Sequence, residues 1–339
     1  MSSAQPGSSG PSRAFPVLGF LGGALSFVRI MRELDLSDIR REFLAPVRIL
    51  VTGSDLPRAQ WVADTLFGPL SAGSWSVAIA PLAQPALADD QPDLVVLTAE
   101  TTESVAELLK RVHSAARSDL AVLAIAFDTD WVPPASENPE APPHLATLSV
   151  RSDDADALTR LAPTLLLDLR PDLALTLGRR FPVFRAPVSE RLIRETSRAN
   201  AQFALLSSLP ANLPLIGGAA GGLADLALLT KNQGILVYKL AGLYGRDLTD
   251  RLSLAIEITP VIGGAFFWRS LARTLLGLLP TVVGGIPKAT VAYAGTSVVG
   301  EMARYYYRTG RRPPPALIAR FQSEAIRLAN ALATRLRQL

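Results

Sequence analysis

The sequence predicts an α/β fold with a doubly wound, mostly parallel sheet over residues 47–170, followed by an all-α, glycine-rich helical domain. First, short uninterrupted apolar segments alternate with helical patterns up to residue 169, and strands buried on both faces have this character. Second, the alternation stops at Asp172, beyond which only helical patterns follow. Third, a length of 339 residues is typical of about two domains.

The expected elements follow one another along the chain. Residues 1–13, rich in serine, glycine and proline, are predicted to be a disordered tail, and residues 14–46 an N-terminal amphipathic segment that ends at Pro46. The uncharged run from Ala14 to Val28 is broken by proline and glycine and follows no basic region, so no secretory signal is expected. Strands are expected at 47–52, 75–80, 93–98, 120–126 and 145–150, and helices at 57–67, 103–116 and 154–169.

The helical domain is expected over residues 171–312, with a C-terminal amphipathic helix within residues 313–339. Its first helices are predicted at 173–181 and 188–206. In the C-terminal helix, apolar residues share one face and arginines lie opposite. The two sets are Leu317, Phe321, Leu328, Leu332 and Leu336 on the one side and Arg320, Arg327, Arg335 and Arg337 on the other.

Composition excludes several kinds of chemistry. The chain has no cysteine, which excludes disulfides, thiolate catalysis and thiolate zinc sites, and its two histidines are too few for a histidine-rich metal site. Residues 89–160 hold 14 acidic and 5 basic side chains, a net charge of −9, whereas residues 231–339 hold 15 basic and 5 acidic, a net charge of +10. The basic half is therefore suited to an anionic membrane surface, or to the acidic half of the same chain.

The first predicted strand leads into Gly53 and a helix near Pro57, where a nucleotide-binding protein would carry its phosphate-binding loop. That loop needs a second glycine, a lysine and a Ser or Thr, but Arg58, Ala59 and Gln60 stand in their places. We therefore expect no catalytic residue, no cofactor and no metal. An atypical nucleotide hydrolase, in which Arg58 replaces the lysine, is the enzymatic alternative.

Long uncharged stretches indicate a membrane. Residues 199–224 carry no charge over 26 positions, enough to span a bilayer, but prolines, glycines and amide side chains interrupt them. Residues 274–287 and 289–300 are too short to span alone. Helices that dock on the cytoplasmic membrane, or enter it partly, fit these lengths. A peripheral or partly inserted protein is expected, with a soluble helical bundle in the cytoplasm as the alternative.

A cluster of aromatic and basic residues precedes the C-terminal helix. Its members are Tyr305, Tyr306, Tyr307, Arg308, Arg311 and Arg312. Tyrosine rings and arginines suit the headgroup region of an anionic membrane, so we expect this cluster to contact lipid or a partner. No recognised nucleic-acid-binding motif accompanies it, and nucleic acid is not an expected partner. An ordinary solvated helix end is the alternative.

Three segments resemble a known bacterial family. They are residues 194–200, residues 210–225 and residues 240–248, the last containing Leu-Tyr-Gly-Arg-Asp as the most specific piece. They look like the YcjF-like helical domain of unknown function that often follows GTPase domains. The resemblance covers about residues 185–310, and it implies a hydrophobic helical module that is joined to a GTPase-type domain and commonly linked to membranes.

The resemblance makes residues 47–170 similar to a degenerate P-loop GTPase domain. Of the Asn-Lys-x-Asp that reads guanine, only Asp130 is present, and residues 81–83 provide no Asp-x-x-Gly switch for magnesium. A receiver-like domain has the same alternation, but Thr98 stands where its phospho-accepting aspartate would be. Under both interpretations the sheet is retained, but the residues that would bind nucleotide or accept phosphate are absent.

The expected function is that of a non-catalytic, pseudo-GTPase-type protein with hydrophobic membrane-associating helices. Such a protein would act as a binding partner or regulator, pairing with a GTPase or with itself. A soluble helical scaffold or regulatory protein is the first alternative, and the atypical nucleotide hydrolase is the second.

Overall fold

The computed structural model falls into two compact units, which we describe separately. The sheet unit comprises Leu36–Arg191 with Gly242–Arg246, and the helical unit comprises Met1–Asp35, Leu192–Ala241 and Asp247–Leu339. The expected domain boundary near residue 170 stays a prediction. The structure describes residues 27–69, 77–79, 92–99, 120–128, 144–152, 154–207, 221–262 and 285–337. The predicted tail at 1–13 and the predicted helix at 103–116 lie outside these ranges.

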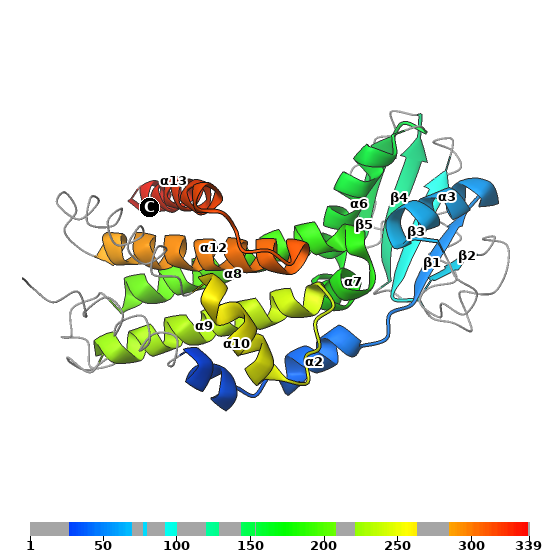
Figure 1. The fold of residues 1–339 in the computed structure, drawn as a ribbon. Coiled ribbons are helices and arrows are strands. Elements are labelled where there is room, and N and C mark those ends of the chain that lie inside the picture. The colour runs from blue at the N-terminus through cyan, green and yellow to red at the C-terminus, as the bar shows by residue number, and fades with distance from the viewer. Residues whose placement is uncertain are drawn as a thin grey trace, which may run out of the picture. The chain divides into compact units, whose positions relative to one another are not determined.

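Five parallel strands form the sheet, which confirms the mixed α/β class (Figure 1). They are β1 (Ile49–Gly53), β2 (Val77–Ile79), β3 (Leu94–Ala99), β4 (Ala121–Phe127) and β5 (Leu145–Val150). Each expected strand is present, with ends that differ by at most two residues. Every residue of β1, β3 and β4 is buried, as their continuous apolar sequences predict.

The strand order is β2-β1-β3-β4-β5. The chain moves outward from β1 to β2, then returns to the other side of β1 for the remaining strands. This is the flavodoxin-like, doubly wound order, which receiver domains share.

Two described helices of the sheet unit pack against the strands and against each other: α3 (Leu56–Phe67) and α6 (Ala155–Leu169). They correspond to the helices predicted at 57–67 and 154–169. The N-terminus of α6 is capped by Asp154, whose carboxylate accepts a hydrogen bond of 2.7 Å from the backbone N–H of Ala157. Burial of Val62 and Leu66 on α3 and of Leu158 and Leu166 on α6 anchors both helices.

The remaining elements of the sheet unit are α2 (Ser37–Leu44), the 3₁₀ turn η1 (Pro171–Leu173), α7 (Ala174–Arg180) and the first part of α8 (Pro182–Leu206). The prediction that this last helix starts at Val188 is wrong, because α8 begins six residues earlier and contains Pro187. A proline inside a helix removes one backbone hydrogen bond. An apolar cluster anchors this early start: Phe184 lies with its ring centroid 6.1 Å from Phe67 and 6.3 Å from Phe181.

The helical unit contains the rest of α8 with α9 (Gly221–Leu243), α10 (Arg251–Ile262), α12 (Gly285–Thr309) and α13 (Pro315–Arg337). In the described part of this unit no strand occurs. Consecutive helices α12 and α13 form a hairpin with extensive contacts (Figure 1). Among the described helices, none is both long enough and apolar enough to cross a bilayer.

Three helices of this unit run side by side. At Gly300 of α12 an added Cβ would lie 2.7 Å from Ile193 of α8 and 3.1 Å from Leu236 of α9, so glycine permits a close approach. One turn away, Asn232 of α9 bonds to Asn200 of α8. Residue 200 of α8 therefore lies beside residue 232 of α9, and residue 193 of α8 lies near residue 236 of α9. The residue numbers run in opposite directions along the two helices, so α8 and α9 are antiparallel.

Candidate functional site

In an open α/β sheet, ligands bind at the carboxyl ends of the strands, near the point where the strand order reverses. Here that place is the end of β1 and β3. It is formed by Gly53 and Thr98, which lie opposite each other in the parallel ladder. The start of α3 follows Gly53 directly, so the degenerate loop of the sequence analysis occupies the expected position.

Gly53 is part of the sheet and packs tightly against its neighbour. A Cβ added there would lie 2.1 Å from Thr98 Oγ1 and 2.4 Å from the Thr98 carbonyl oxygen. Its backbone is not among those with positive φ, so conformational freedom does not require glycine here. The close approach of two strands requires it instead.

Thr98 is also fixed within the sheet. Its side chain is 1 % exposed, and its hydroxyl donates a hydrogen bond of 3.3 Å to the Thr52 carbonyl. A phospho-acceptor must be open to its donor, whereas this hydroxyl is enclosed by the sheet.

The N-terminus of α3 carries a negative charge of its own. Asp55 is the N-cap residue, with an extended backbone, and Pro57 follows in the first turn. The positive end of a helix attracts anions, and a P-loop uses this end to hold phosphate. The Asp55 side chain makes no capping hydrogen bond here, but its negative charge at this end of the helix opposes a second anion.

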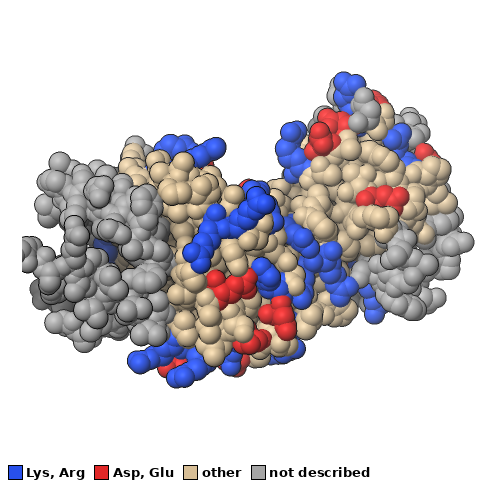
Figure 2. Space-filling model, in the orientation of Figure 1, with Lys and Arg blue, Asp and Glu red and all other residues tan. Residues whose placement is uncertain are grey.

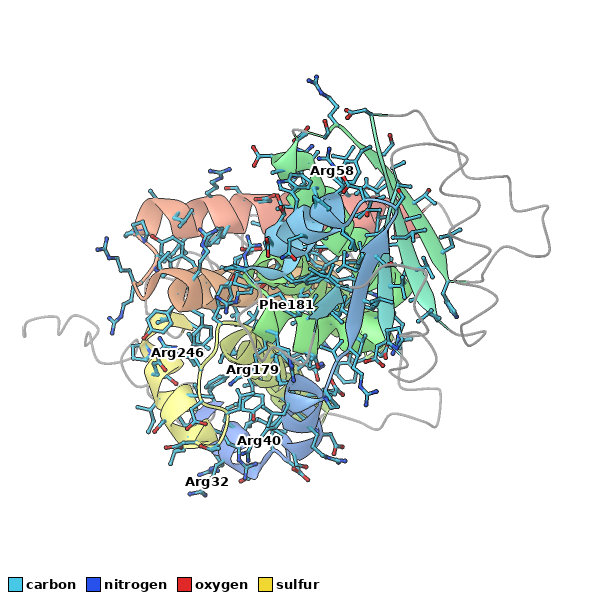
Figure 3. The ribbon with its side chains drawn as sticks, turned by 90° about the vertical axis from the view of Figure 1, so that its right-hand side faces the viewer. Arg32, Arg40, Arg58, Arg179, Phe181 and Arg246 are labelled. Carbon is cyan, nitrogen blue, oxygen red and sulfur yellow. The ribbon has the colours of Figure 1, made fainter. Side chains whose placement is uncertain are left out.

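Arg58, the residue in the place of the P-loop lysine, is held by the sheet unit (Figure 3). Its Nη1 donates a hydrogen bond of 3.2 Å to the Ser152 carbonyl beyond β5. The guanidinium also lies 4.9 Å from the centroid of the Phe127 ring and 5.8 Å from that of Trp61. Its Nε is buried and has no hydrogen-bond partner among the described residues.

The other two residues of the degenerate loop, Ala59 and Gln60, have structural roles within α3. Ala59 is fully buried, where its small side chain lets α3 approach the sheet. Gln60 is exposed, and its amide donates a hydrogen bond of 3.0 Å to Asp64 one turn later. Neither side chain is placed to hold a phosphate or a magnesium ion.

Asp128 directly follows β4 and has an unusual backbone conformation, with φ of 53°. Aspartate tolerates this left-handed region because its short side chain can bond locally. Its carboxylate accepts a hydrogen bond of 3.0 Å from the Ser152 N–H. Hydrogen bonds from the hydroxyl and the N–H of Ser152 lower the pKa of Asp128 below its ordinary value, with smaller contributions from the charges of Arg58 and Arg151.

Several of the described groups at the strand ends therefore bond to one another, whereas Arg58 Nε and Thr52 Oγ1 are buried without a hydrogen-bond partner among the described residues. Ser152 joins Arg58 to Asp128, so these three residues link the loops after β4 and β5 to α3. Such a set stabilises the edge of the sheet but offers no nucleophile and no pair of acids. Residues 81–83 and Asp130 lie outside the described residues. In the parts of the chain that are described, no three His, Asp or Glu side chains gather in a way that could hold a metal ion.

The aromatic–basic cluster divides into inner and outer members. Tyr306 donates a hydrogen bond of 2.8 Å to Glu257 of α10, and Tyr307 is buried with its ring 5.6 Å from that of Tyr306. Tyr305 is partly buried. Tyr306 and Tyr307 thus help to hold α12 in place within the helical unit. The arginines are the exposed members: Arg308, Arg311 and Arg312.

The segment that carries the strongest resemblance forms the end of α9. Gly245 has φ of +81°, and its N–H donates to the Gly242 carbonyl, as at many helix C-termini. Arg179 of α7 donates from Nη1 to the carbonyls of Gly242 and Arg246, at 2.8 and 3.2 Å (Figure 3). Gly242 also faces Phe43, whose ring an added Cβ would meet at 2.5 Å. These residues serve helix termination and packing.

Sequence reasoning missed a buried polar network in the helical unit. Asn200 and Thr296 are both fully buried, and the Asn200 amide donates to the Thr296 hydroxyl at 2.8 Å. Asn232 Nδ2 donates to the side-chain oxygen Oδ1 of Asn200 at 2.7 Å, and Gln233 Nε2 donates to the Thr296 hydroxyl at 3.3 Å. The available signal was a set of polar residues within otherwise apolar helices. The network fixes the mutual register of α8, α9 and α12.

No family model, no curated protein and no solved structure matches this chain. The resemblance to the YcjF-like domain therefore stays a prediction.

Proposed function

We propose that this chain is a non-catalytic binding protein, in which an α/β scaffold without nucleotide chemistry is joined to a helical unit that docks on an anionic membrane. The absence of nucleotide chemistry is inferred mainly from the close packing of Gly53 against Thr98. A Cβ added at Gly53 would lie only 2.1 Å from Thr98 Oγ1. The glycine that a phosphate-binding loop would need for its turn belongs here to a strand ladder.

Two further side chains support the absence of nucleotide chemistry. Asp55 places a carboxylate at the helix end where phosphate would bind. Arg58 already has the Ser152 carbonyl and two aromatic rings as neighbours, so it is a poor substitute for a lysine that reaches into a phosphate. Both contacts weigh against the atypical nucleotide hydrolase.

The origin of the scaffold is part of the proposal. The flavodoxin-like strand order supports a receiver-like ancestry, with the buried Thr98 in the place of the phospho-accepting aspartate. The resemblance of the helical segments favours a degenerate GTPase instead. Under either ancestry the protein acts by binding, for which a GTPase or a second copy is the proposed protein partner.

The layout of the helical unit supports membrane docking. Lys288, near the start of α12, donates a hydrogen bond of 2.8 Å to Ser207, just after the end of α8. Since α9 is antiparallel to α8, its start lies at this same end. Residues 208–220 and 263–284 lie outside the described residues, and their sequences contain only two charges, Arg269 and Arg273. Weakly charged sequence next to the helices of this unit suits a bilayer interface.

A soluble regulatory or scaffold protein is the second candidate. The observation that favours it is the burial of Tyr307 and the partial burial of Tyr306 against Glu257, which reduces the tyrosine surface that could meet lipid. Membrane contact would then depend on other residues of the helical unit.

Vesicle flotation of the full-length protein separates the two candidates. We expect the protein to float with vesicles of phosphatidylcholine and phosphatidylglycerol, and to float less with phosphatidylcholine alone. High salt should release the electrostatic part of the binding, while apolar insertion should survive it. Protein that ignores both kinds of vesicle and stays monodisperse without detergent would instead establish the soluble candidate.

A further inference from the structure

The face of the C-terminal helix α13 that packs within the chain carries mostly small or polar side chains. Its most deeply buried described side chains are Ile318, Gln322, Ala325 and Ala329. They follow one another at intervals of four, three and four residues, which is the spacing of a single helix face. Only one of the four is a large apolar residue. Burial of alanine and of a glutamine stem contributes little hydrophobic stabilisation, so this face holds α13 weakly.

The larger apolar residues of α13 lie about a quarter turn away round the helix. Leu317 and Phe321 are only partly buried, and Leu328 is 40 % exposed. We call these three residues the outer stripe. Leu317 and Phe321 are thus partly covered by the rest of the chain, and Leu328 is the most exposed of the three. The apolar face recognised in the sequence therefore includes side chains that stay partly open to solvent, a quarter turn from the residues that are buried.

Basic side chains border the outer stripe. Arg320 and Arg327 are exposed on α13, Arg308 is exposed in the last turn of α12, and Arg311 and Arg312 are exposed in the turn between the two helices. Figure 2 shows in blue the Lys and Arg side chains on one face of the molecule. The one described acidic residue of α13 is Glu324, whose carboxylate lies 3.9 Å from Arg327, at the margin of an ion pair. Both partners are well exposed, so this pair has little effect on the local charge.

We propose that the outer stripe of α13 lies on the surface of an anionic bilayer, with Leu317, Phe321 and Leu328 among the acyl chains and Arg320 and Arg327 at the lipid phosphates. This inference rests on the proposed membrane docking and names the element that makes it. Partly exposed apolar side chains beside arginines on one helix are typical of a helix that lies at a membrane interface.

Charge decides between lipid and a second copy as the occupant. Two α13 helices joined through their outer stripes would bring the arginines of both copies to the edge of one interface. Like charges at that edge oppose association. An anionic lipid surface instead neutralises each arginine, and each basic residue near the surface strengthens binding by about fivefold.

The first test measures vesicle binding of the full-length protein and of a variant with Phe321→Ser and Leu328→Ser. We expect binding to vesicles containing phosphatidylglycerol to weaken about tenfold, because two apolar side chains no longer enter the bilayer. A second variant with Arg320→Gln and Arg327→Gln should lose affinity for these vesicles, and its remaining binding should depend less on salt. The matched control is Leu161→Ser in the sheet unit, since Leu161 is also 40 % exposed and lies on the helix α6.

The second test places a reporter on the helix. Because the natural chain has no cysteine, Leu328→Cys creates a single site for an environment-sensitive fluorophore. Its emission should shift to shorter wavelength when anionic vesicles are added, whereas the same label at Leu161→Cys should not respond. Circular dichroism of each variant verifies that the helices are retained.

The outcomes separate this inference from the proposed function. If the wild-type protein binds no vesicles, membrane docking itself is wrong. If the wild type binds, but the Phe321/Leu328 variant binds equally well and the Leu328 label does not shift, docking stands and α13 is not the contact. Sedimentation showing a wild-type dimer that this variant dissociates would also overturn the inference, in favour of a second copy.

Discussion

Replacing Gly53 by alanine tests the reason we give for this glycine. The added methyl group would lie 2.1 Å from Thr98 Oγ1 and 2.4 Å from the Thr98 carbonyl oxygen, whereas ordinary contacts begin at 3.4 Å. The hydroxyl could move by rotation about χ1, but the carbonyl belongs to the backbone of β3. The two strands must therefore separate locally, in a sheet whose neighbouring residues are fully buried.

The magnitude follows from two opposing effects. Overpacking of a core position costs about 1–3 kcal/mol. The lower backbone entropy of alanine in the unfolded chain offsets roughly 0.5–1 kcal/mol of that cost. We therefore expect Gly53→Ala to lower the free energy of unfolding by about 1–2 kcal/mol. Thr98→Ala in the same chain should rescue part of the loss by removing the hydroxyl, while the carbonyl contact remains.

Urea unfolding followed by far-UV circular dichroism measures these free energies, and unchanged m-values would show that the unfolded states are comparable. Ser54→Ala is the control, because Ser54 is the next residue and is exposed. Its effect should stay within about 0.5 kcal/mol. If Gly53→Ala is as stable as the wild type, the glycine is not there for strand packing. That result would favour a role for Gly53 in a flexible phosphate-binding turn.

Three further predictions concern the helical termini, the polar network and acid stability. Gly245→Ala should cost about 1 kcal/mol in urea, because Gly245 has φ of +81°; an unchanged midpoint would contradict the cap. Asn200→Ala should cost about 1–3 kcal/mol by leaving Asn232 and Thr296 without their partner, and a neutral result would mean that the network is dispensable. The pKa of Asp128 is lowered in the fold, so its contribution to stability is present above the ordinary value of 3.8 and is lost as pH falls through its folded pKa. Asp128→Asn should therefore reduce the loss of stability on acidification below about pH 4.

The sheet could be predicted because its signal is local. Strands buried on both faces, such as β3 and β4, have uninterrupted apolar sequences, and each is bounded by polar or loop residues. The start of α8 could not be predicted, because Pro187 alone suggests a helix boundary. The ring of Phe67, far away in the sequence, packs against Phe184 and helps to stabilise the turn before this proline.

The contacts of the candidate site were not predictable in the same way. Arg58 meets Ser152 across 94 positions of sequence, so no local pattern indicates that its guanidinium is engaged. Asn200 and Thr296 are separated by 96 positions. In α13 the amphipathic pattern did not indicate that Ala329 packs with Ala289 and Tyr293 of α12, while Leu328 is 40 % exposed.

The most direct test of the central claim is calorimetry of the full-length protein with GTP and with ATP, each in the presence of magnesium. A strand-bound Gly53, a carboxylate at Asp55 and an engaged Arg58 predict no binding heat at micromolar concentrations and no shift of the thermal unfolding midpoint. A magnesium-dependent micromolar site that Arg58→Ala abolishes would contradict the claim, and would make this chain a nucleotide-binding protein with an unusual loop.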